Sequence, residues 1–297
     1  VFQAEKPVGM PIRGVDDCYD AIFNPPVVGP SYPWEALNRL TYGQRRGELV
    51  SIGGGTGCGK TLIGHELAAW DAAVHGWKVL AIMMEETNAE TYQGIAGKIA
   101  SIPYHMPLEE GETPRDMEKL REIINGLKGK VDVWDLESIE DPETTWAQIT
   151  QVIRTRGEEY DVIMIDNATT LSEGLNSSDK NDFLGKVNSE FAKFAKQFNF
   201  MAVMFSHLNA PPPGSRSHEH GGKVLESQFS GSRAAMRYSH IILGFERNKY
   251  AVEPNCSFIT CIKNRKYGRT GRFKTFYSRT TGRLKEREWD DELWKDA

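Results

Sequence analysis

Short apolar runs alternate along the chain with longer amphipathic stretches. Runs of four to seven residues, typical of buried strands, occupy residues 49–52, 78–84, 131–136, 161–165, 201–205 and 241–245. Apolar residues at helical spacing occupy residues 62–74, 111–127, 146–156 and 183–197. This alternation predicts an α/β fold, in which helices flank a mainly parallel central sheet.

The pattern changes near both ends of the chain. Two alternating runs, residues 257–263 and 272–277, flank a Tyr-Gly-Arg-Thr-Gly turn and predict a C-terminal β-hairpin that closes the sheet. Near the start, prolines interrupt residues 1–33 and exclude long regular elements. We therefore expect an arm or linker there, with one short helix at residues 15–23.

This short helix would carry an apolar stripe made of Val15, Tyr19, Ile22 and Phe23. An isolated apolar stripe needs a partner surface. Packing on the helix's own domain and docking on a neighbouring subunit are equally consistent with the sequence.

A glycine-rich segment follows the first apolar run and satisfies the P-loop spacing G-x-x-x-x-G-K-[ST]. In a P-loop, backbone N–H groups face a phosphate chain, the lysine reaches the terminal phosphates and the hydroxyl ligates Mg²⁺. The predicted nucleotide contacts are Gly54, Gly55, Thr56, Gly57, Cys58, Gly59, Lys60 and Thr61. A glycine-rich hairpin turn would explain the glycines, but not Lys60 and Thr61 at the start of a helix.

Reactive side chains follow three other expected strands, at the sheet edge where ligands bind in open parallel sheets. Asp166 ends one run as a Walker B residue does, and with Thr61 it is a predicted Mg²⁺ ligand. Glu85 and Glu86 end another; either could deprotonate an attacking water, although a solvated helix start explains the pair equally well. His207 ends a third and is a candidate contact to the γ-phosphate.

Two cations, Lys263 and Arg265, lie where the penultimate run meets the hairpin turn. Cations so placed can act as an arginine finger that reaches the nucleotide of a neighbouring subunit. A basic edge strand that discourages aggregation is the alternative.

Composition limits the function classes. The net charge is −5, yet residues 216–287 hold 16 Lys or Arg against 5 Asp or Glu, so any contact with nucleic acid should be local. The sequence has no apolar run long enough for a membrane span and no secretory signal. The four cysteines form no C-x-x-C pair, which argues against structural zinc and disulfides. We expect a cytoplasmic protein; a phage-infected host cell or the mitochondrial matrix is also compatible.

Together these motifs resemble the RecA-fold hexameric replicative DNA helicases, which include DnaB, the phage helicase-primases and Twinkle. The resemblance covers about residues 34–284, and its motifs are G-G-G-T-G-C-G-K-T, M-M-E-E-T, Y-D-V-I-M-I-D-N, F-S-H-L, S-G-S-R-A-A-M-R, I-L-G-F-E-R-N-K and K-N-R-K-Y-G-R-T-G. It implies a RecA-like helicase ATPase domain at residues 34–288, after the arm of residues 1–33 and before a tail of residues 289–297.

The resemblance also implies roles for single residues. These are general base for Glu85, γ-phosphate sensor for His207, trans-acting cations for Lys263 and Arg265, and nucleotide contacts for Arg247 and Tyr277. The family's strand-gripping loop corresponds to residues 209–227, which are Pro- and His-rich here; residues 167–181 form a second candidate loop. The implied DNA contacts are Asn209, Arg216, Lys223, Ser232 and Arg233.

The function that this resemblance implies is a ring-forming, hexameric DNA helicase. It would hydrolyse ATP, dTTP or another NTP with Mg²⁺ at subunit interfaces and translocate on single-stranded DNA at replication forks, with a primase or polymerase as further partners. The family's primase or zinc-binding part is absent from these residues, so priming is not expected of them. Two alternatives stay open: a RecA-like recombinase or clock-type ATPase, and a nucleotide-gated assembly or loader protein.

Overall fold

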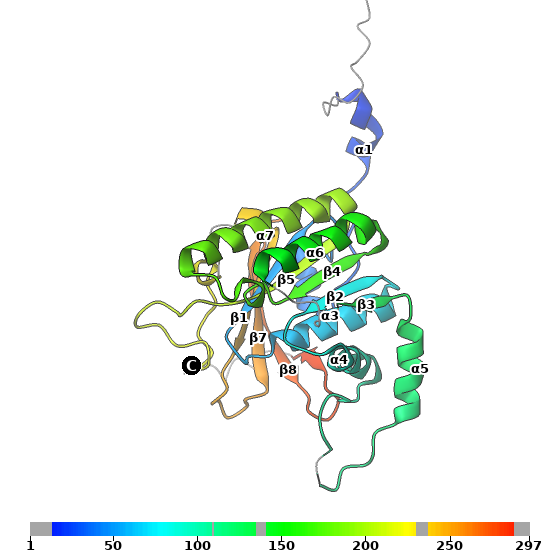
Figure 1. Cartoon of the computed structure of the whole chain (residues 1–297), viewed down its shortest axis with the longest axis vertical. Helices are drawn as coiled ribbons and strands as arrows, with labels where there is room; N and C mark the ends of the chain where they lie inside the picture. Colours follow the sequence, from blue (N-terminus) through cyan, green and yellow to red (C-terminus); the bar gives the residue numbers. More distant parts are fainter. Residues whose placement is uncertain (1–13, 109, 135–140, 230–236, 288–297) are drawn as a thin grey trace, which may run out of the picture.

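One β-sheet organises the part of the chain that this computed structural model describes, which is residues 14–108, 110–134, 141–229 and 237–287. Its strands are β1 (Leu49–Gly54), β2 (Val79–Met83), β3 (Val131–Val133), β4 (Val162–Asp166), β5 (Met201–His207), β6 (Ile241–Arg247), β7 (Cys256–Asn264), β8 (Gly271–Tyr277) and β9 (Leu284–Glu286). They pair in the order β3-β2-β4-β5-β1-β6-β7-β8-β9 (Figure 1).

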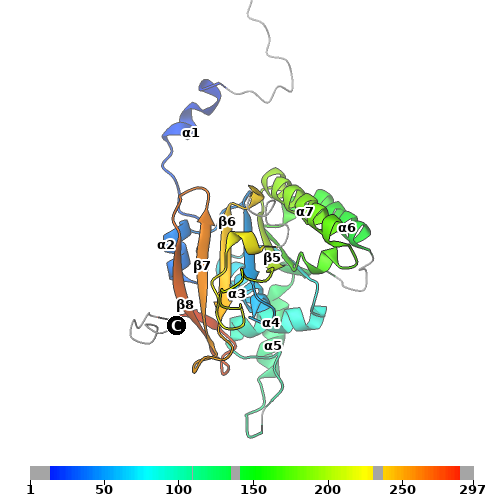
Figure 2. The ribbon, with the colours of Figure 1, turned by 90° about the vertical axis from the view of Figure 1, so that its left-hand side faces the viewer.

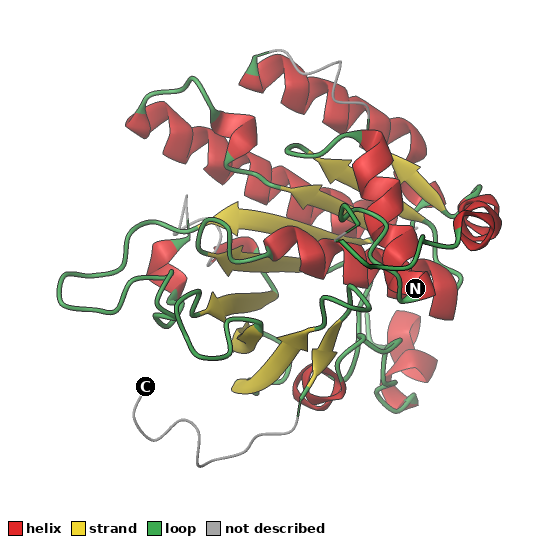
Figure 3. Cartoon of the chain, turned by 90° about the horizontal axis from the view of Figure 1, so that it is seen from below, coloured by secondary structure: helices red, strands yellow, loops and turns green. Residues whose placement is uncertain are grey.

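The strands from β3 to β6 in this order are parallel, whereas β7, β8 and β9 are antiparallel to their neighbours. The expected mainly parallel α/β sheet with a C-terminal hairpin is therefore confirmed. In Figure 3, where strands are yellow, their direction changes gradually across the sheet, as the twist of paired strands requires.

Helices cover both faces of the sheet. The helices of the described residues are α1 (Tyr19–Phe23), α2 (Glu35–Thr41), α3 (Lys60–Val74), α4 (Asn88–Ala100), α5 (Met117–Leu127), α6 (Pro142–Arg156) and α7 (Ser177–Phe198). α6 and α7 lie over one face, and α3, α4 and α5 lie over the other (Figure 1). None of the described helices is long and apolar enough to cross a membrane.

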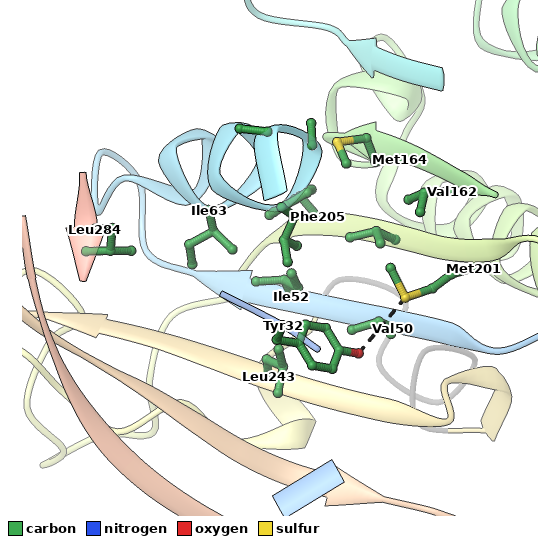
Figure 4. Packing of buried hydrophobic residues seen from close by; sticks show 14 of the residues in the cluster. Tyr32, Val50, Ile52, Ile63, Val162, Met164, Met201, Phe205, Leu243 and Leu284 are labelled. Carbon is green, nitrogen blue, oxygen red and sulfur yellow. Dashed lines mark hydrogen bonds between the residues drawn. The ribbon is translucent and has the colours of Figure 1, made fainter. Parts of the chain in front are cut away.

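Successive residues of each central strand point to opposite faces and fill two apolar clusters. Val50 and Ile52 belong to the cluster under α3, which includes Ile63 and Phe205 (Figure 4), whereas Leu49 belongs to the cluster under α7. Because both faces are covered, the central strands appear in the sequence as continuous apolar runs rather than alternating ones.

Several helices begin elsewhere than the apolar spacing predicts. α6 and α7 begin earlier, because their first turns are polar and are capped by the side chains of Asp141 and Asn176. α5 begins at Met117 rather than residue 111, because Asp116 is its N-cap and accepts a hydrogen bond from the Lys119 amide.

Two elements were missed at the sequence level. α4 has a weakly apolar first turn, and its start is marked instead by a capping box in which Thr87 and Glu90 bond each other's backbone N–H groups. β9 has only three residues and depends on pairing with β8, so its sequence alone gives no strand signal.

The predicted short helix of the arm consists of a 3₁₀ turn, Asp16–Cys18, followed by α1. α1 stands clear of the sheet and its helices in Figures 1 and 2. Tyr32, which the sequence analysis assigned to the arm, is buried, and the Gly29 amide donates to the Tyr42 carbonyl. Packing of the domain therefore begins near Gly29.

All four cysteines are free thiols in the described residues: Cys58, Cys256 and Cys261 are buried and Cys18 is half-buried.

Asp71 of α3 is a buried carboxylate with incomplete hydrogen bonding. Gln44 Nε2 donates to its Oδ1 at 2.6 Å, while Oδ2 has no hydrogen-bond partner among the described residues. Burial raises the pKa of Asp71 to about 8, and the bond from Gln44 opposes this only in part. At neutral pH the folded protein therefore holds a proton on Asp71 that the unfolded chain has released.

This raised pKa predicts a pH-dependent stability. Between about pH 4 and about pH 8 the native state binds the extra proton, so the free energy of unfolding falls as the pH rises. Asp71→Asn should reduce this fall, measured as the difference in melting temperature between pH 5 and pH 8. Asp16→Asn, at an exposed carboxylate of the arm, is the control. An undiminished fall in Asp71→Asn would contradict the prediction.

Candidate active site

The P-loop joins β1 to α3, as its sequence context predicts. Gly57 and Gly59 have φ angles of +66° and +101°, a left-handed conformation that favours glycine. The Lys60 side chain is 6% exposed and folds back on the loop, where its Nζ donates to the carbonyls of Gly54 and Gly55 at 3.1 and 3.3 Å. Burial lowers the pKa of Lys60. A buried ammonium held by two loop carbonyls is suited to binding a phosphate.

Parallel pairing brings the ends of four strands to the same place. Gly54 at the end of β1 pairs with His207 at the end of β5, and Met83 at the end of β2 pairs with Asp166 at the end of β4. The sequence-predicted residues of the P-loop and of three other strand ends therefore lie together at one sheet edge.

Thr61 and Asp166 are in direct contact: the Thr61 hydroxyl donates to Asp166 Oδ2 at 2.6 Å. Burial raises the pKa of Asp166 to about 6, against the opposing effects of Thr61 and the Lys60 charge. One hydroxyl and one carboxylate fit Mg²⁺, which prefers oxygen ligands and is often held by one or two side chains together with substrate phosphates. The described residues contain no cluster of three or more His, Cys, Asp or Glu that would hold a metal alone.

A chain of polar contacts links Lys60 to Glu85 through His207. Lys60 Nζ lies 3.0 Å from His207 Nδ1, and His207 Nε2 lies 3.3 Å from Glu85 Oε1. Because an ammonium can only donate, Nδ1 accepts, and the proton of a neutral ring is on Nε2, which donates to Glu85. Lys60, the candidate sensor and the candidate base are thus connected by one chain of contacts.

The two adjacent glutamates have different surroundings. Glu85 Oε1 accepts hydrogen bonds from Asn167 Nδ2 at 2.6 Å and from the Thr170 hydroxyl at 3.2 Å. Burial favours protonation of Glu85, but the bonds from His207, Asn167 and Thr170 outweigh it and hold its pKa below the usual value. Glu86 instead contacts His65 Nε2 at 2.9 Å, away from the P-loop. The geometry therefore favours Glu85 over Glu86 as the base.

Asn167 and Thr169 take part in the site, although the sequence indicated them only as members of the second candidate loop, residues 167–181. The Asn167 carboxamide bonds Glu85 and lies 3.1 Å from His207 Nε2, while its Oδ1 accepts from the Thr169 hydroxyl at 2.6 Å. Thr169 in turn accepts from the His207 amide at 3.0 Å. The only signal in the sequence is the polar pair Asp-Asn directly after the strand.

Lys263 and Arg265 lie at the opposite edge of the sheet from the P-loop. Antiparallel pairing sets Asn264 beside Ile241 at the start of β6, whereas Gly54 pairs with Phe245 four residues further along that strand. At about 3.3 Å per residue the two levels are roughly 13 Å apart. Arg265 is exposed and donates to the Arg237 carbonyl. The structure does not bring these cations to the P-loop of their own chain.

Arg247 and Tyr277, the other predicted nucleotide contacts, end β6 and β8 at the P-loop edge. Arg247 Nε donates to the Pro254 carbonyl at 2.7 Å. Tyr277 is half-buried, and the Lys98 ammonium lies 5.4 Å from its ring centroid. Both residues therefore lie at the same sheet edge as the P-loop.

Of the predicted DNA contacts, Asn209, Arg216 and Lys223 belong to the loop after β5, while Ser232 and Arg233 lie outside the described residues. Arg216 and Lys223 line a cavity of about 200 Å³ together with Arg272. Arg272 forms a 2.8 Å ion pair with the buried Glu246. Two cations of the loop and one of β8 thus line the same cavity.

The fold and the clustered strand ends define a P-loop NTPase with a RecA-like core. The chain belongs to the DnaB-like helicase C-terminal domain family, whose profile matches residues 31–286. The family predicted from the sequence motifs is confirmed.

Individual relatives agree with this family. Over 252 residues the chain is 27% identical to the DNA helicase/primase of Enterobacteria phage T3. That match covers 84% of this chain and 44% of the phage protein, so the chain spans less than half the length of this relative.

Solved structures agree in fold. A DnaB-like replicative helicase, described with its interactions with primase, has a TM-score of 0.73 at 18% identity, covering 92% of this chain and 68% of that one. A KaiC-like protein from Pyrococcus horikoshii OT3 has a TM-score of 0.60 at 14% identity, covering 89% of this chain and all of that one. At such identities the likeness shows the fold alone, so the family match, and not the fold, separates the helicase from the clock-type alternative.

Proposed function

We propose that this chain is the motor domain of a replicative DNA helicase that hydrolyses a nucleoside triphosphate at the interfaces of a ring. One observation carries the proposal. The P-loop, Asp166 and Glu85 share one sheet edge, while Lys263 and Arg265 lie roughly 13 Å away at the other. A triphosphate at the P-loop can therefore receive these cations only from another copy of the chain.

Within one subunit the residues divide the chemistry of hydrolysis. The P-loop amides and Lys60 would bind the phosphates, and Thr61 with Asp166 would hold Mg²⁺, which neutralises phosphate charge when bound. Glu85 is ionised, and the hydrogen bonds from Asn167 and Thr170 fix its orientation, so it can take a proton from an attacking water. Lys263 and Arg265 of the next subunit would stabilise the charge that develops on the transferred phosphoryl group.

His207 is the proposed link between hydrolysis and DNA movement. Its ring joins Lys60 to Glu85, and a γ-phosphate would compete for the Lys60 ammonium. Its backbone leads directly into the loop of residues 209–227, which carries the proposed DNA contacts. Loss of the γ-phosphate would let the Lys60–His207 contact re-form. The loop of residues 209–227 would then take one position with the γ-phosphate bound and another after its loss.

The proposed ring depends on a contact between unlike surfaces of neighbouring copies. Val15, Tyr19, Ile22 and Phe23 are 56–70% exposed, so the arm helix does not pack on its own domain. Met106 and Leu108, which precede α5, and Met117, its first residue, are also exposed. In Figure 1, α5 lies far from α1. Docking of one patch on the other in the next copy is a head-to-tail contact, which generates a ring when the rotation closes.

Single-stranded DNA, ATP or another NTP, and Mg²⁺ are the proposed ligands, and the cytoplasm or an equivalent reducing compartment is the proposed location. The names of the relatives extend the proposal to a primase as partner: one is a helicase/primase, and another was described with its interactions with primase.

The first test is nucleotide turnover as a function of protein concentration, with and without a poly-pyrimidine single strand, alongside assembly state by light scattering. We expect turnover per chain to rise steeply with ring formation and to increase further with the strand, because the site is completed by a neighbour. Turnover proportional to monomer and indifferent to DNA would overturn the motor proposal.

Mixing two inactive variants tests whether Arg265 acts in trans. Glu85→Gln and Arg265→Ala should each lower turnover about 100-fold or more, since each removes a group that acts in the transition state. In an equimolar mixed ring, about one interface in four joins an intact Glu85 to an intact Arg265. The mixture should therefore recover about a quarter of the turnover of the unaltered protein. Glu85→Gln mixed with Glu85→Gln/Arg265→Ala is the control. Equal turnover in both mixtures would mean that Glu85 and Arg265 act from the same subunit, and would contradict the trans role of Arg265.

The arm is tested by removing residues 1–27, a boundary that keeps the Gly29 contact with Tyr42. We expect the shortened chain to bind nucleotide as a monomer and to lose most of its turnover, because the neighbour's cations are no longer held in place. Ile22→Asp/Phe23→Asp should act in the same way, and Asp20→Asn should not. Rings of unchanged size in the shortened chain would refute the docking role.

A further inference from the structure

A compact turn lies within the loop that follows β5. In residues 217–222, the amides of His220 and Gly222 donate to the Ser217 carbonyl at 3.1 and 2.9 Å, and the Ser217 hydroxyl contacts His220 Nδ1 at 2.8 Å. Gly221 has a φ angle of +77°, which lets the chain reverse. The 217–222 turn is therefore a small folded unit rather than an extended segment.

This turn is attached to the connection between β6 and β7. The Lys249 amide donates to the Glu219 carbonyl at 2.9 Å, and His220 forms a β-bridge with Asn248. The rings of His220 and Tyr250 lie 4.7 Å apart. The turn and residues 248–250 therefore form one surface.

The same surface rests on the P-loop at two points. A Cβ atom added at Gly55 would lie 2.6 Å from His218 Cβ, and one added at Gly57 would lie 2.9 Å from Lys249 Nζ. Lys249 Nζ donates to the Thr56 carbonyl at 2.8 Å. So close an approach is possible only because Gly55 and Gly57, two of the three residues 55–57, have no side chain.

The docked turn does not satisfy all its polar groups. His218 Nε2 contacts the Asn209 carbonyl at 3.2 Å, whereas Nδ1 is buried and has no hydrogen-bond partner among the described residues. Buried polar atoms are normally paired, so an arrangement that exposes or pairs this atom competes with the docked one. Lys249 contributes a single half-exposed hydrogen bond, which water can replace.

We propose that His218 and Lys249 are positioning residues that fasten the loop of residues 209–227 to the P-loop, so that the loop responds to nucleotide directly as well as through His207. This inference rests on the proposed function of the chain as a nucleotide-driven motor. Phosphates that bind the P-loop amides reorient the peptide groups of residues 55–57. Because the packing against Gly55 and Gly57 leaves no free space, such reorientation displaces the 217–222 turn.

Hydrogen exchange of residues 215–222 tests the contact without DNA. A non-hydrolysable ATP analogue with Mg²⁺ should change the exchange of this segment at least about threefold in the unaltered protein. His218→Ala and Lys249→Ala should show the altered exchange before nucleotide is added and little further change, and Lys249→Arg should restore the response. Val252→Ala, at a fully exposed side chain of the same connection, is the matched control.

A second readout is the effect of the analogue on the affinity for a labelled single strand. Coupling between two sites commonly amounts to about 5–150-fold, and we expect a change in this range for the unaltered protein. His218→Ala should reduce it to less than about threefold while still binding the analogue. A purely structural role of His218 would lower both affinities together and leave their coupling intact.

The outcomes separate the two proposals. If the analogue binds but exchange of residues 215–222 stays constant, or if the His218→Ala variant keeps its coupling, the positioning role is overturned while the motor proposal stands. If the unaltered protein binds no nucleotide at all, both are overturned.

Discussion

Parallel pairing of β1 with β5 and β6 is the constraint on which the rest of the structure depends. It places the P-loop, His207 and Arg247 at one edge of the sheet, and pairing of β2 with β4 adds Glu85 and Asp166. Each of these residues lies at the end of a different strand, so none of the contacts between them is local in sequence. A slip of one residue in the pairing of a strand would move each of its side chains to the opposite face of the sheet and separate the residues of the site.

The site is electrostatically prepared for a charged ligand. Burial disfavours the charged forms of both Lys60 and Asp166, lowering the pKa of the first and raising that of the second to about 6. A triphosphate with its metal ion supplies each with the opposite charge it lacks. Such shifted pKa values, at the start of α3 and at the end of β4, are frequent at functional sites.

The surfaces that we propose to contact neighbouring subunits lie on opposite sides of the molecule. The P-loop and the cations at Lys263 and Arg265 occupy opposite sheet edges, and the exposed stripe of α1 and the exposed patch beside α5 occupy opposite ends. Surfaces that complement each other across a molecule, rather than within it, favour head-to-tail assembly. The same asymmetry makes a single subunit catalytically incomplete in our proposal.

The sequence by itself determined the succession of strands and helices along the chain apart from α4 and β9, and it determined the P-loop and the family, because buried strands and phosphate loops leave local patterns in the chain. It also singled out Glu85, His207 and Asp166 as strand-end residues, but not which of Glu85 and Glu86 faces the P-loop, nor the part played by Asn167. Only the tertiary structure decided these points and the contact of His218 with Gly55. They depend on strand register and on side-chain packing between residues far apart in the chain, which no local pattern records.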